Sequence, residues 1–460
     1  MKKTKIISVL VLLCSISIYS QDKKAELEWF SGAKMGMFLH WGLYSHAAGE
    51  WKGKKTKGNE HFMLYERIPL KEYGLIGNDF NPTGFNAEKW VKTAKNAGMK
   101  YIVITAKHHD GFAMYDSKTS DYNIVKKTKF ARDPIKELAA ACKKEGIKLG
   151  LYYSLGRDWE DPDVPTNWPT KAGRSNTWDY PNEDSKNLSA YIERKVKPQL
   201  KELLTNYGDI AMIWFDTPEL VTQKQSQEIK ELIEMLQPKC LVNSRVGNNL
   251  GDYDIIEQQL MDTIKHRPWE ACLTMGKNWG YNKFDTIYKS PEVIIRNFVD
   301  IISKGGNMLL NVGPTGEGLF PKQTDAEFSA FHNWIKINAE AVYNTYPWKV
   351  YGESFNEQPK KKEKKEEFHD LVFDDTPKDT NPDIRFTAKE NIVYVFARSI
   401  KEDNFTIKSF AKNDKIKSIT LLGNNKKIIW KFSENGLNIK MPSLNKSGLP
   451  IYVFKIEFKN

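Results

Sequence analysis

The sequence predicts a (β/α)8-like barrel over residues 21–347 and a small antiparallel β-sandwich over residues 348–460. From Gly36 to about Tyr346, short and almost wholly apolar runs alternate with helical segments, which is typical of parallel strands covered on both faces. Polar side chains that can do chemistry follow nearly every apolar run. After Trp348 the pattern changes to short runs in which apolar and polar residues alternate.

Six apolar runs predict buried strands of the barrel: Met37–Trp41, Tyr101–Thr105, Lys148–Ser154, Ile210–Phe215, Cys240–Ser244 and Met308–Val312. The helices between them carry clear signals, since Asp133 is an N-cap before Pro134 and Gly146 ends the same helix. Repeated units of this kind build either a closed barrel or a doubly wound open sheet. Functional residues at the ends of many different strands are typical of a barrel, so the pattern favours the barrel.

The last part of the chain is predicted to be all β. The mixed charge run Lys360–Glu367 is typical of a solvated linker. Alternating runs follow at Asp383–Thr387, Ile392–Ala397, Phe405–Ser409, Ser418–Leu422, Lys427–Lys431 and Ile451–Phe458. Such a domain either binds sugar or braces the barrel, and we favour bracing.

The first residues indicate the compartment. Lys2, Lys3 and Lys5 precede the apolar run Ile6–Ile18, and the small residue Ser20 follows it. This is the pattern of a cleavable signal peptide over residues 1–20, too short and wrongly flanked for a membrane span. We therefore expect a secreted or periplasmic protein with no membrane span.

The remaining composition excludes several classes of protein. The net charge is +11, but lysines are spread along the chain and no basic helix stands out, so we expect no nucleic-acid partner. Removal of the signal leaves Cys142, Cys240 and Cys272, an odd and sparse set that argues against a disulfide framework. Most of the 13 tryptophans are expected in the core, although indole faces also suit sugar rings.

Two motifs offer groups that recognise hydroxyls. His40 ends the first strand, and the pair Glu50-Trp51 follows it with a carboxylate and an indole. His108 and His109 stand together at the end of the second strand, before Asp110. Adjacent histidines suggest a metal, but no HxH or HExxH pattern accompanies them, so hydroxyl recognition is favoured over metal ligation.

Asp216 follows Trp214 and Phe215 at the end of an apolar strand. Burial of a carboxylate is unfavourable unless it has a partner or a task. One interpretation is a cap for the next helix, because Thr217-Pro218 is typical of a turn. The other interpretation is the nucleophile of a double-displacement reaction.

A retaining glycoside hydrolase needs a second carboxyl group about 5–5.5 Å from its nucleophile. The next predicted strand, Cys240–Ser244, is followed by Arg245, which supplies a cation. The segment Gly251–Glu257 then offers three carboxylates, and Glu270 offers a fourth. Spacing alone does not choose between them.

The motifs together resemble the α-L-fucosidases of glycoside hydrolase family twenty-nine. The strings GMFLHWGLYS, GEW, AKHHDGF, GLYYS, WFD, NSR, GDYDIIE, WEACLTMGKNWGY and GGNMLLNVGPTGEG occur in family order between Trp29 and Thr345. The resemblance implies a barrel with a C-terminal β-sandwich, a retaining exo-acting mechanism on fucosylated glycans, and no metal or cofactor.

The resemblance also implies roles for individual residues. Asp216 matches the family nucleophile, Glu257 is favoured as the acid/base, and Glu270 is the second choice. The positions that match the sugar-holding residues are His40, Glu50, Trp51, His108, His109, Tyr153, Trp214 and Arg245. Two other functions stay open: an exo-enzyme for α-L-galactosides, since an apolar slot discriminates poorly against one added hydroxyl, and a non-catalytic fucose-binding protein.

Overall fold

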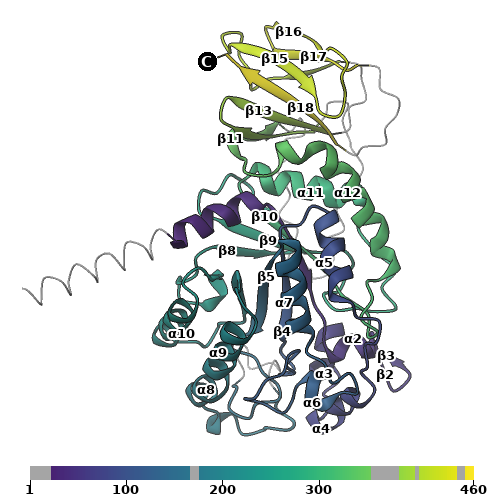
Figure 1. Cartoon of the computed structure of the whole chain (residues 1–460), viewed down its shortest axis with the longest axis vertical. Coiled ribbons are helices and arrows are strands. Elements are labelled where there is room, and N and C mark those ends of the chain that lie inside the picture. Colours follow the sequence, from purple (N-terminus) through teal and green to yellow (C-terminus); the bar gives the residue numbers. More distant parts are fainter. Residues whose placement is uncertain (1–21, 166–175, 354–382, 399–403, 443–450, 460) are drawn as a thin grey trace, which may run out of the picture.

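The computed structural model describes residues 22–165, 176–353, 383–398, 404–442 and 451–459. The predicted signal peptide and the charge run Lys360–Glu367 lie outside these residues. The chain has a large α/β part and, at one end, a smaller part built from β-strands (Figure 1).

The large part is built on an eight-stranded sheet in which every pairing is parallel. Its strands are β1 (Met35–Leu39), β4 (Tyr101–Lys107), β5 (Lys148–Ser154), β6 (Met212–Asp216), β7 (Leu241–Val242), β8 (Asp254–Glu257), β9 (Trp269–Thr274) and β10 (Asn307–Val312). The order is β7-β6-β5-β4-β1-β10-β9-β8. The edge strands β7 and β8 meet through one parallel bridge, Asn243 to Tyr253, so the sheet curls round to the barrel that the sequence predicts.

Helices cover the outside of the sheet (Figure 1). The longer ones are α5 (Ala87–Asn96), α7 (Pro134–Glu145), α9 (Lys197–Asn206), α10 (Gln223–Leu236), α11 (Pro291–Ser303) and α12 (Asp325–Asn338). The signals predicted for α7 are confirmed: the Asp133 side chain accepts from Lys136 N, and Gly146 adopts φ 71° at the C-cap. Thr222 caps α10 by bonding to Gln225 N.

Shorter elements lie mostly in the loops. They are α2 (Leu43–Ala47), the hairpin β2 (Glu50–Trp51) and β3 (Lys54–Lys55), η1 (Asn59–His61), α3 (Phe62–Tyr65), α4 (Leu70–Tyr73), η2 (Gly74–Asn78), α6 (Ile124–Lys127), η3 (Glu183–Ser185), α8 (Leu188–Tyr191), η4 (Ile192–Val196), η5 (Ser244–Val246), η6 (Lys322–Thr324) and η7 (Ala339–Ala341). Most of them lie after the carboxyl ends of strands, where barrels carry their functional loops.

Alternation along the strands divides the buried side chains into two groups. One set of large side chains fills the barrel interior, including Phe38, Tyr101, Tyr152, Trp214 and Cys272. The alternate residues pack outward against the helices. The barrel is therefore a filled core, and polar groups reach solvent only at its ends.

The C-terminal part consists of two antiparallel sheets over a shared core. Their strands are β11 (Tyr346–Glu353), β12 (Asp383–Lys389), β13 (Ile392–Arg398), β14 (Asn404–Ile407), β15 (Ile416–Leu421), β16 (Ile429–Ser433), β17 (Gly436–Lys440) and β18 (Ile451–Phe458). This part sits on α11 and α12 (Figure 1), where Trp334 Nε1 donates to Ile451 O at 3.1 Å and Arg385 Nε pairs with Asp300 Oδ1 at 2.7 Å.

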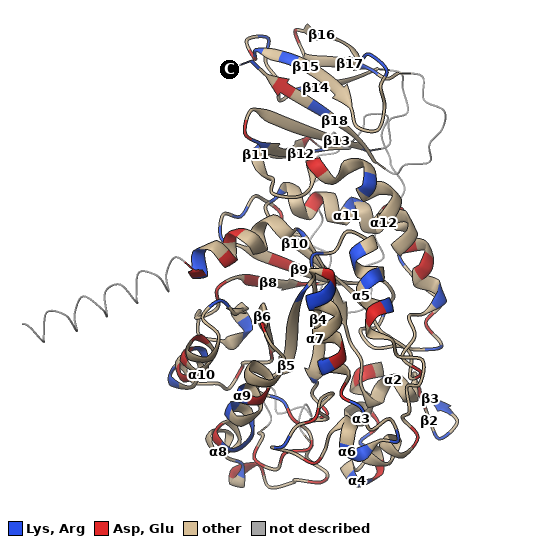
Figure 2. Ribbon diagram, in the orientation of Figure 1, with Lys and Arg blue, Asp and Glu red and all other residues tan. Residues whose placement is uncertain are grey.

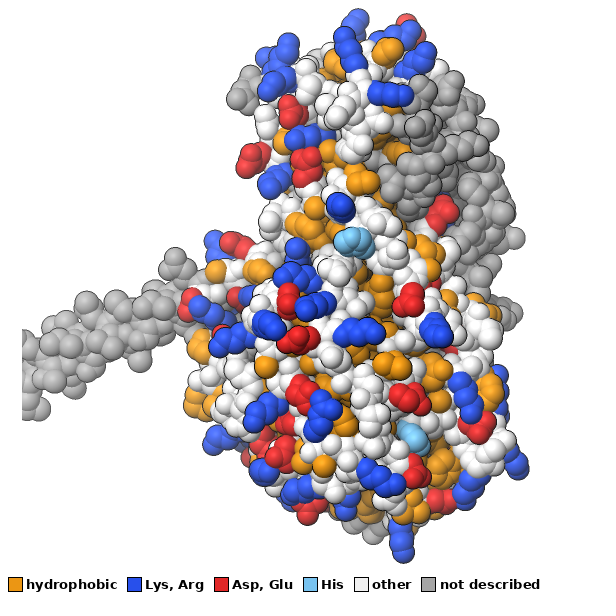
Figure 3. Space-filling view, turned by 45° about the vertical axis from the view of Figure 1, so that its right-hand side comes forward, with side chains coloured by type: hydrophobic (Ala, Val, Ile, Leu, Met, Phe, Trp, Pro, Cys, Tyr) orange, Lys and Arg blue, Asp and Glu red, His pale blue; other side chains and the backbone are white. Residues whose placement is uncertain are grey.

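Lysine, arginine and carboxylate side chains are interspersed along the described elements in Figure 2. Positive and negative side chains are mixed over the face of the described residues that Figure 3 shows. Within the described residues, no helix combines the length and the apolar character that crossing a membrane requires.

Candidate active site

Asp216 lies at the carboxyl end of β6, with 17% of its side chain exposed. Its carboxylate accepts from Tyr152 Oη at 2.8 Å, Arg245 Nη1 at 2.7 Å and Thr217 N at 2.9 Å. Burial acts to raise the pKa of Asp216, but Arg245, Tyr152, Arg157 and Thr217 N together hold it below its ordinary value. The carboxylate is therefore ionised, and since Thr222 caps the next helix, Asp216 is not a capping residue.

Arg245 joins two carboxylates. It lies on η5, just after β7, and its Nη2 donates to Glu257 Oε2 while Nη1 holds Asp216. Its guanidinium carbon lies 5.2 Å from the centre of the Trp214 ring. Glu257 ends β8 with 21% of its side chain exposed. One guanidinium therefore keeps Asp216 and Glu257 close together at the open end of the barrel.

Glu270, the second candidate for the acid/base, lies in a different place. It is the second residue of β9 and is fully buried. Tyr101 Oη donates to Glu270 Oε2, and Trp214 Nε1 donates to Oε1 at 2.9 Å. Burial raises the pKa of Glu270 to about 7, against an ordinary value of 4.5. Its carboxyl therefore supports Trp214 from within the barrel core.

We expect Glu270 to make stability depend on pH. Between about pH 4.5 and pH 7 the folded chain keeps a proton that the unfolded chain has lost, so stability falls as pH rises through this window. The expected loss is about 3 kcal/mol. In denaturant unfolding from pH 4 to pH 8, the stability of the parent relative to that of Glu270→Gln should fall by this amount. A constant difference between the two proteins would contradict the shifted pKa.

Three buried histidines lie near Asp216: His109 faces its carboxylate, and His40 and His108 pack against Tyr152, which donates to it. His40 Nδ1 lies 2.7 Å from Asn311 Oδ1, while Asn311 Nδ2 donates to Trp279 O at 2.8 Å. His40 Nδ1 is therefore the donor, and its Nε2 carries a lone pair. Burial lowers the pKa of His40 to about 4, so this ring is neutral.

His109 has the same tautomer. Ser154 Oγ donates to Arg157 O at 2.8 Å, so Ser154 accepts from His109 Nδ1 at 2.6 Å. His109 Nε2, with its lone pair, lies 3.6 Å from Asp216 Oδ2. Burial lowers the pKa of His108 and His109 well below the ordinary value. Neutral rings with outward lone pairs are acceptors for the hydroxyl groups of a ligand.

The structure corrects the prediction for Tyr153. Successive residues of a strand face opposite sides, and Tyr153 faces the helices, where its Oη donates to Gln199 Oε1 at 2.7 Å. Tyr152 faces inward, bonds Asp216 and stacks between His108 (5.4 Å) and Trp214 (5.5 Å). The string GLYYS does not by itself tell which tyrosine faces the barrel interior.

The two tyrosines offer a matched test. Tyr152→Phe keeps the stacked ring but removes one donor to Asp216, so the pKa of that carboxyl should rise. We expect the acid limb of the kcat/KM profile to move upward by about one to two pH units, since a hydrogen bond to a charged group contributes about 1.5–3 kcal/mol. Tyr153→Phe should leave the limb in place. If the acid limb shifts by the same amount in Tyr152→Phe and Tyr153→Phe, Tyr152 does not stabilise the ionised Asp216.

Glu50 and Trp51 lie beside this group rather than in it. They form hairpin β2–β3, where Glu50 pairs with Lys283 at 3.1 Å and the Trp51 ring packs on Phe62 at 5.9 Å. The pair Glu60-His61, which sequence reasoning missed, is closer to the histidines. Glu60 is buried and accepts from Gly280 N at 3.1 Å, and the His61 ring stacks on His109 at 5.2 Å.

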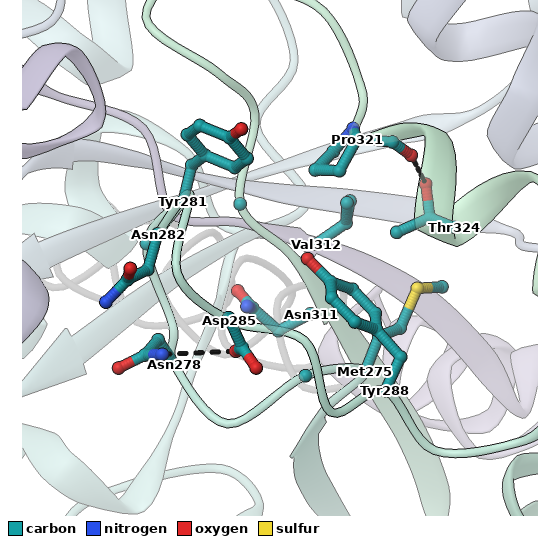
Figure 4. Close-up of a pocket in the computed structure, with 13 residues that line it drawn as sticks. Met275, Asn278, Tyr281, Asn282, Asp285, Tyr288, Asn311, Val312, Pro321 and Thr324 are labelled. Atoms are coloured by element: carbon teal, nitrogen blue, oxygen red, sulfur yellow. Dashed lines mark hydrogen bonds between the residues drawn. The ribbon is translucent and has the colours of Figure 1, made fainter. Parts of the chain in front are cut away.

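Trp279 is a second residue that sequence reasoning missed, although it stands in the quoted string WEACLTMGKNWGY. Its ring lies 5.1 Å from His40. The loop that carries it also forms most of a small pocket, which Asn311 lines as well (Figure 4). There Asp285 accepts from Lys277 N at 2.7 Å and from Asn278 Nδ2 at 3.1 Å, contacts that hold the loop in shape.

A barrel whose strand ends gather an ionised carboxylate, a second carboxylate on the same arginine, neutral histidines and indoles belongs to the glycoside hydrolases. The comparisons give the family. The family model described as Alpha-L-fucosidase matches residues 15–340, and that of the Alpha-L-fucosidase C-terminal domain matches residues 377–457. The chain belongs to the alpha-L-fucosidase family.

Individual relatives support the same family assignment. The chain is 27% identical to tissue alpha-L-fucosidase of Mus musculus over 94% of this chain and 91% of that protein. The crystal structure of alpha-L-fucosidase from Vibrio sp. strain EJY3 matches with a TM-score of 0.82 and 30% identity over 95% of this chain and 73% of that one. Alpha-L-fucosidase AlfC from Lactobacillus casei, solved with alpha-L-fucose product, matches at 0.65 and 40% identity over 68% of this chain and 99% of that one.

Proposed function

We propose that the chain is an exo-acting, retaining α-L-fucosidase in which Asp216 is the nucleophile and Glu257 the acid/base. The observation that carries the proposal is the bridge made by Arg245 to both carboxylates. It supports the short separation that double displacement needs. The burial of Glu270 in the barrel core favours Glu257 over it.

In the first step an oxygen of Asp216 attacks the anomeric carbon, the glycosidic C–O bond breaks, and Glu257 gives a proton to the leaving oxygen. Glu257 must be protonated for this step, so substrate binding has to loosen its contact with Arg245. All four residues of β8 are only partly buried, and such a strand can yield.

In the second step Glu257 takes a proton from water, the water oxygen attacks the anomeric carbon, and Asp216 leaves. Once Asp216 has become a neutral ester, Arg245 no longer balances its charge. The guanidinium can then stabilise the ionised Glu257 as the general base. Arg245 thus serves one carboxylate in each half of the reaction.

We propose that the sugar is held by His40, His108, His109, Trp214 and Arg245, joined by Tyr152, Glu60, His61 and Trp279. Neutral His40 and His109 would each accept a hydrogen bond from a sugar hydroxyl through Nε2, and the indoles would pack on C–H patches. The Lactobacillus casei protein, which is 40% identical over 68% of this chain, was solved with alpha-L-fucose product, and this supports fucose as the sugar.

The substrate is tested by comparing aryl α-L-fucoside with aryl α-L-galactoside, which differ by one hydroxyl. We expect kcat/KM to favour the fucoside by about 10–200-fold, the range for a small group in an apolar slot. A higher kcat/KM for the galactoside would indicate that the enzyme acts on α-L-galactosides. Binding of L-fucose without hydrolysis of any substrate would indicate a binding protein.

We propose further that residues 1–20 are a cleaved signal peptide and that the mature enzyme is secreted or periplasmic. The basic start, the apolar run and Ser20 support this. We propose residues 21–347 and 348–460 as the two domains, with the second bracing the barrel. The contacts of Trp334 and Arg385 support bracing.

A further inference from the structure

We propose that His61, His108 and His109 form a site for a divalent transition-metal ion, with Zn²⁺ as the probe, and that bound metal excludes the sugar. Each imidazole offers one nitrogen, and these three nitrogens lie within 4.8 Å of one another. Imidazole nitrogen is a preferred ligand of Zn²⁺, and three protein ligands with one open position are a common arrangement.

The three imidazole rings lie close together in the structure. Ring centres are 4.3 Å apart for His108 and His109, 5.2 Å for His61 and His109, and 5.8 Å for His61 and His108. Bonds of about 2.0–2.1 Å to a tetrahedral ion place nitrogens roughly 3.4 Å apart, so the ligand atoms must approach one another by at most about 1.4 Å. His61 ends the short η1 element and is partly exposed, so it is the ligand that can adjust.

His108 and His109 each have a ring nitrogen with a lone pair that an ion can accept. His109 Nδ1 is committed to Ser154, which leaves Nε2 facing Asp216. His108 is only 4% exposed, and its Nδ1 has no hydrogen-bond partner among the described residues. A buried nitrogen of this kind points to an external ligand. Asp216 adds negative charge beside the triad, while Arg157 opposes a cation.

Local spacing does not reveal this triad. His108 and His109 are adjacent at the end of β4, but the third ring comes from a separate loop that folds over them. Because His109 Nε2 faces the carboxylate proposed as the nucleophile, an ion there would occupy the place of a sugar hydroxyl. The competition with sugar rests on the proposed function, but metal binding itself does not.

Calorimetric titration of the full chain with ZnCl2 in a non-coordinating buffer tests the site. We expect one ion per chain, and binding at least about tenfold weaker in His61→Gln and in His108→Gln. His332→Gln, which removes an exposed histidine on α12, is the control and should bind as the parent does. Circular dichroism establishes that each variant is folded. Binding that is unchanged in a folded His61→Gln overturns the proposal.

Competition between Zn²⁺ and L-fucose is the second part of the test. We expect saturating L-fucose to weaken Zn²⁺ binding at least about tenfold, and Zn²⁺ to inhibit turnover competitively. Simultaneous binding of metal and sugar overturns the proposed exclusion. If His61-dependent metal binding occurs in a chain that neither binds fucose nor hydrolyses fucosides, the metal site stands and the proposed function fails.

Discussion

Asp216→Gly is expected to lower turnover of an aryl α-L-fucoside by about four orders of magnitude, and azide is expected to restore part of it. Loss of a nucleophile removes the covalent route altogether, and effects of this size are typical of such changes. Glycine leaves a space next to Arg245 that a small anion can occupy. The azide attacks the anomeric carbon directly, so the product is the glycosyl azide of inverted configuration.

The control for this variant is Asp254→Asn, which removes a carboxylate at the amino end of β8, the end away from the site. Asp254 begins β8 and pairs with Lys265 at 2.6 Å. We expect it to retain activity within about threefold, as is usual for a partly exposed ion pair. If Asp216→Gly is folded and turns over substrate as fast as Asp254→Asn does, Asp216 is not the nucleophile.

The second large effect concerns Glu257. Glu257→Gln cannot donate a proton, so hydrolysis of an unactivated fucosyl disaccharide should fall by about 10²–10⁴-fold. An aryl fucoside with an acidic phenol needs little protonation, so its bond cleavage should be spared and its intermediate should accumulate. Rates for both substrates, with a burst measurement on the aryl fucoside, test this.

Glu270→Gln is the matched comparison for Glu257→Gln. Glu270 is buried and hydrogen-bonded to Tyr101 and Trp214, so a neutral amide can replace its neutral carboxyl. We expect a loss of less than about tenfold that is the same for both substrates, because a shift of Trp214 would affect sugar binding and not leaving-group protonation. If Glu270→Gln loses activity only on the disaccharide, which has the poor leaving group, and Glu257→Gln is unaffected, then Glu270 and not Glu257 is the acid/base.

The fold could be predicted largely from the sequence because buried parallel strands are continuous apolar runs. Each of the six predicted runs overlaps a strand of the barrel, and the start and end of α7 follow the signals at Asp133 and Gly146. β9 is not among the predicted strands, since Glu270 interrupts its apolar character. Its buried carboxyl is tolerated because two side chains donate to it.

The site was harder to predict, since it depends on which way side chains point and on contacts distant in sequence. Tyr152 and Tyr153 differ only in the face of the strand that each occupies. Glu50-Trp51 and Glu60-His61 both place a carboxylate beside an aromatic ring, and only the folded chain brings the second pair to His109. Asp216 and Arg245 follow directly from strand ends, where the fold itself fixes position.

The most direct test of Asp216 as nucleophile is to trap the intermediate. A 2-deoxy-2-fluoro-L-fucosyl fluoride should react once per chain, and peptide mass analysis should find the fluorofucosyl group esterified to Asp216. Protection by L-fucose would establish that labelling occurs in the sugar site. A label on Glu257 or Glu270, or an inverted product with no covalent adduct, would contradict the assignment.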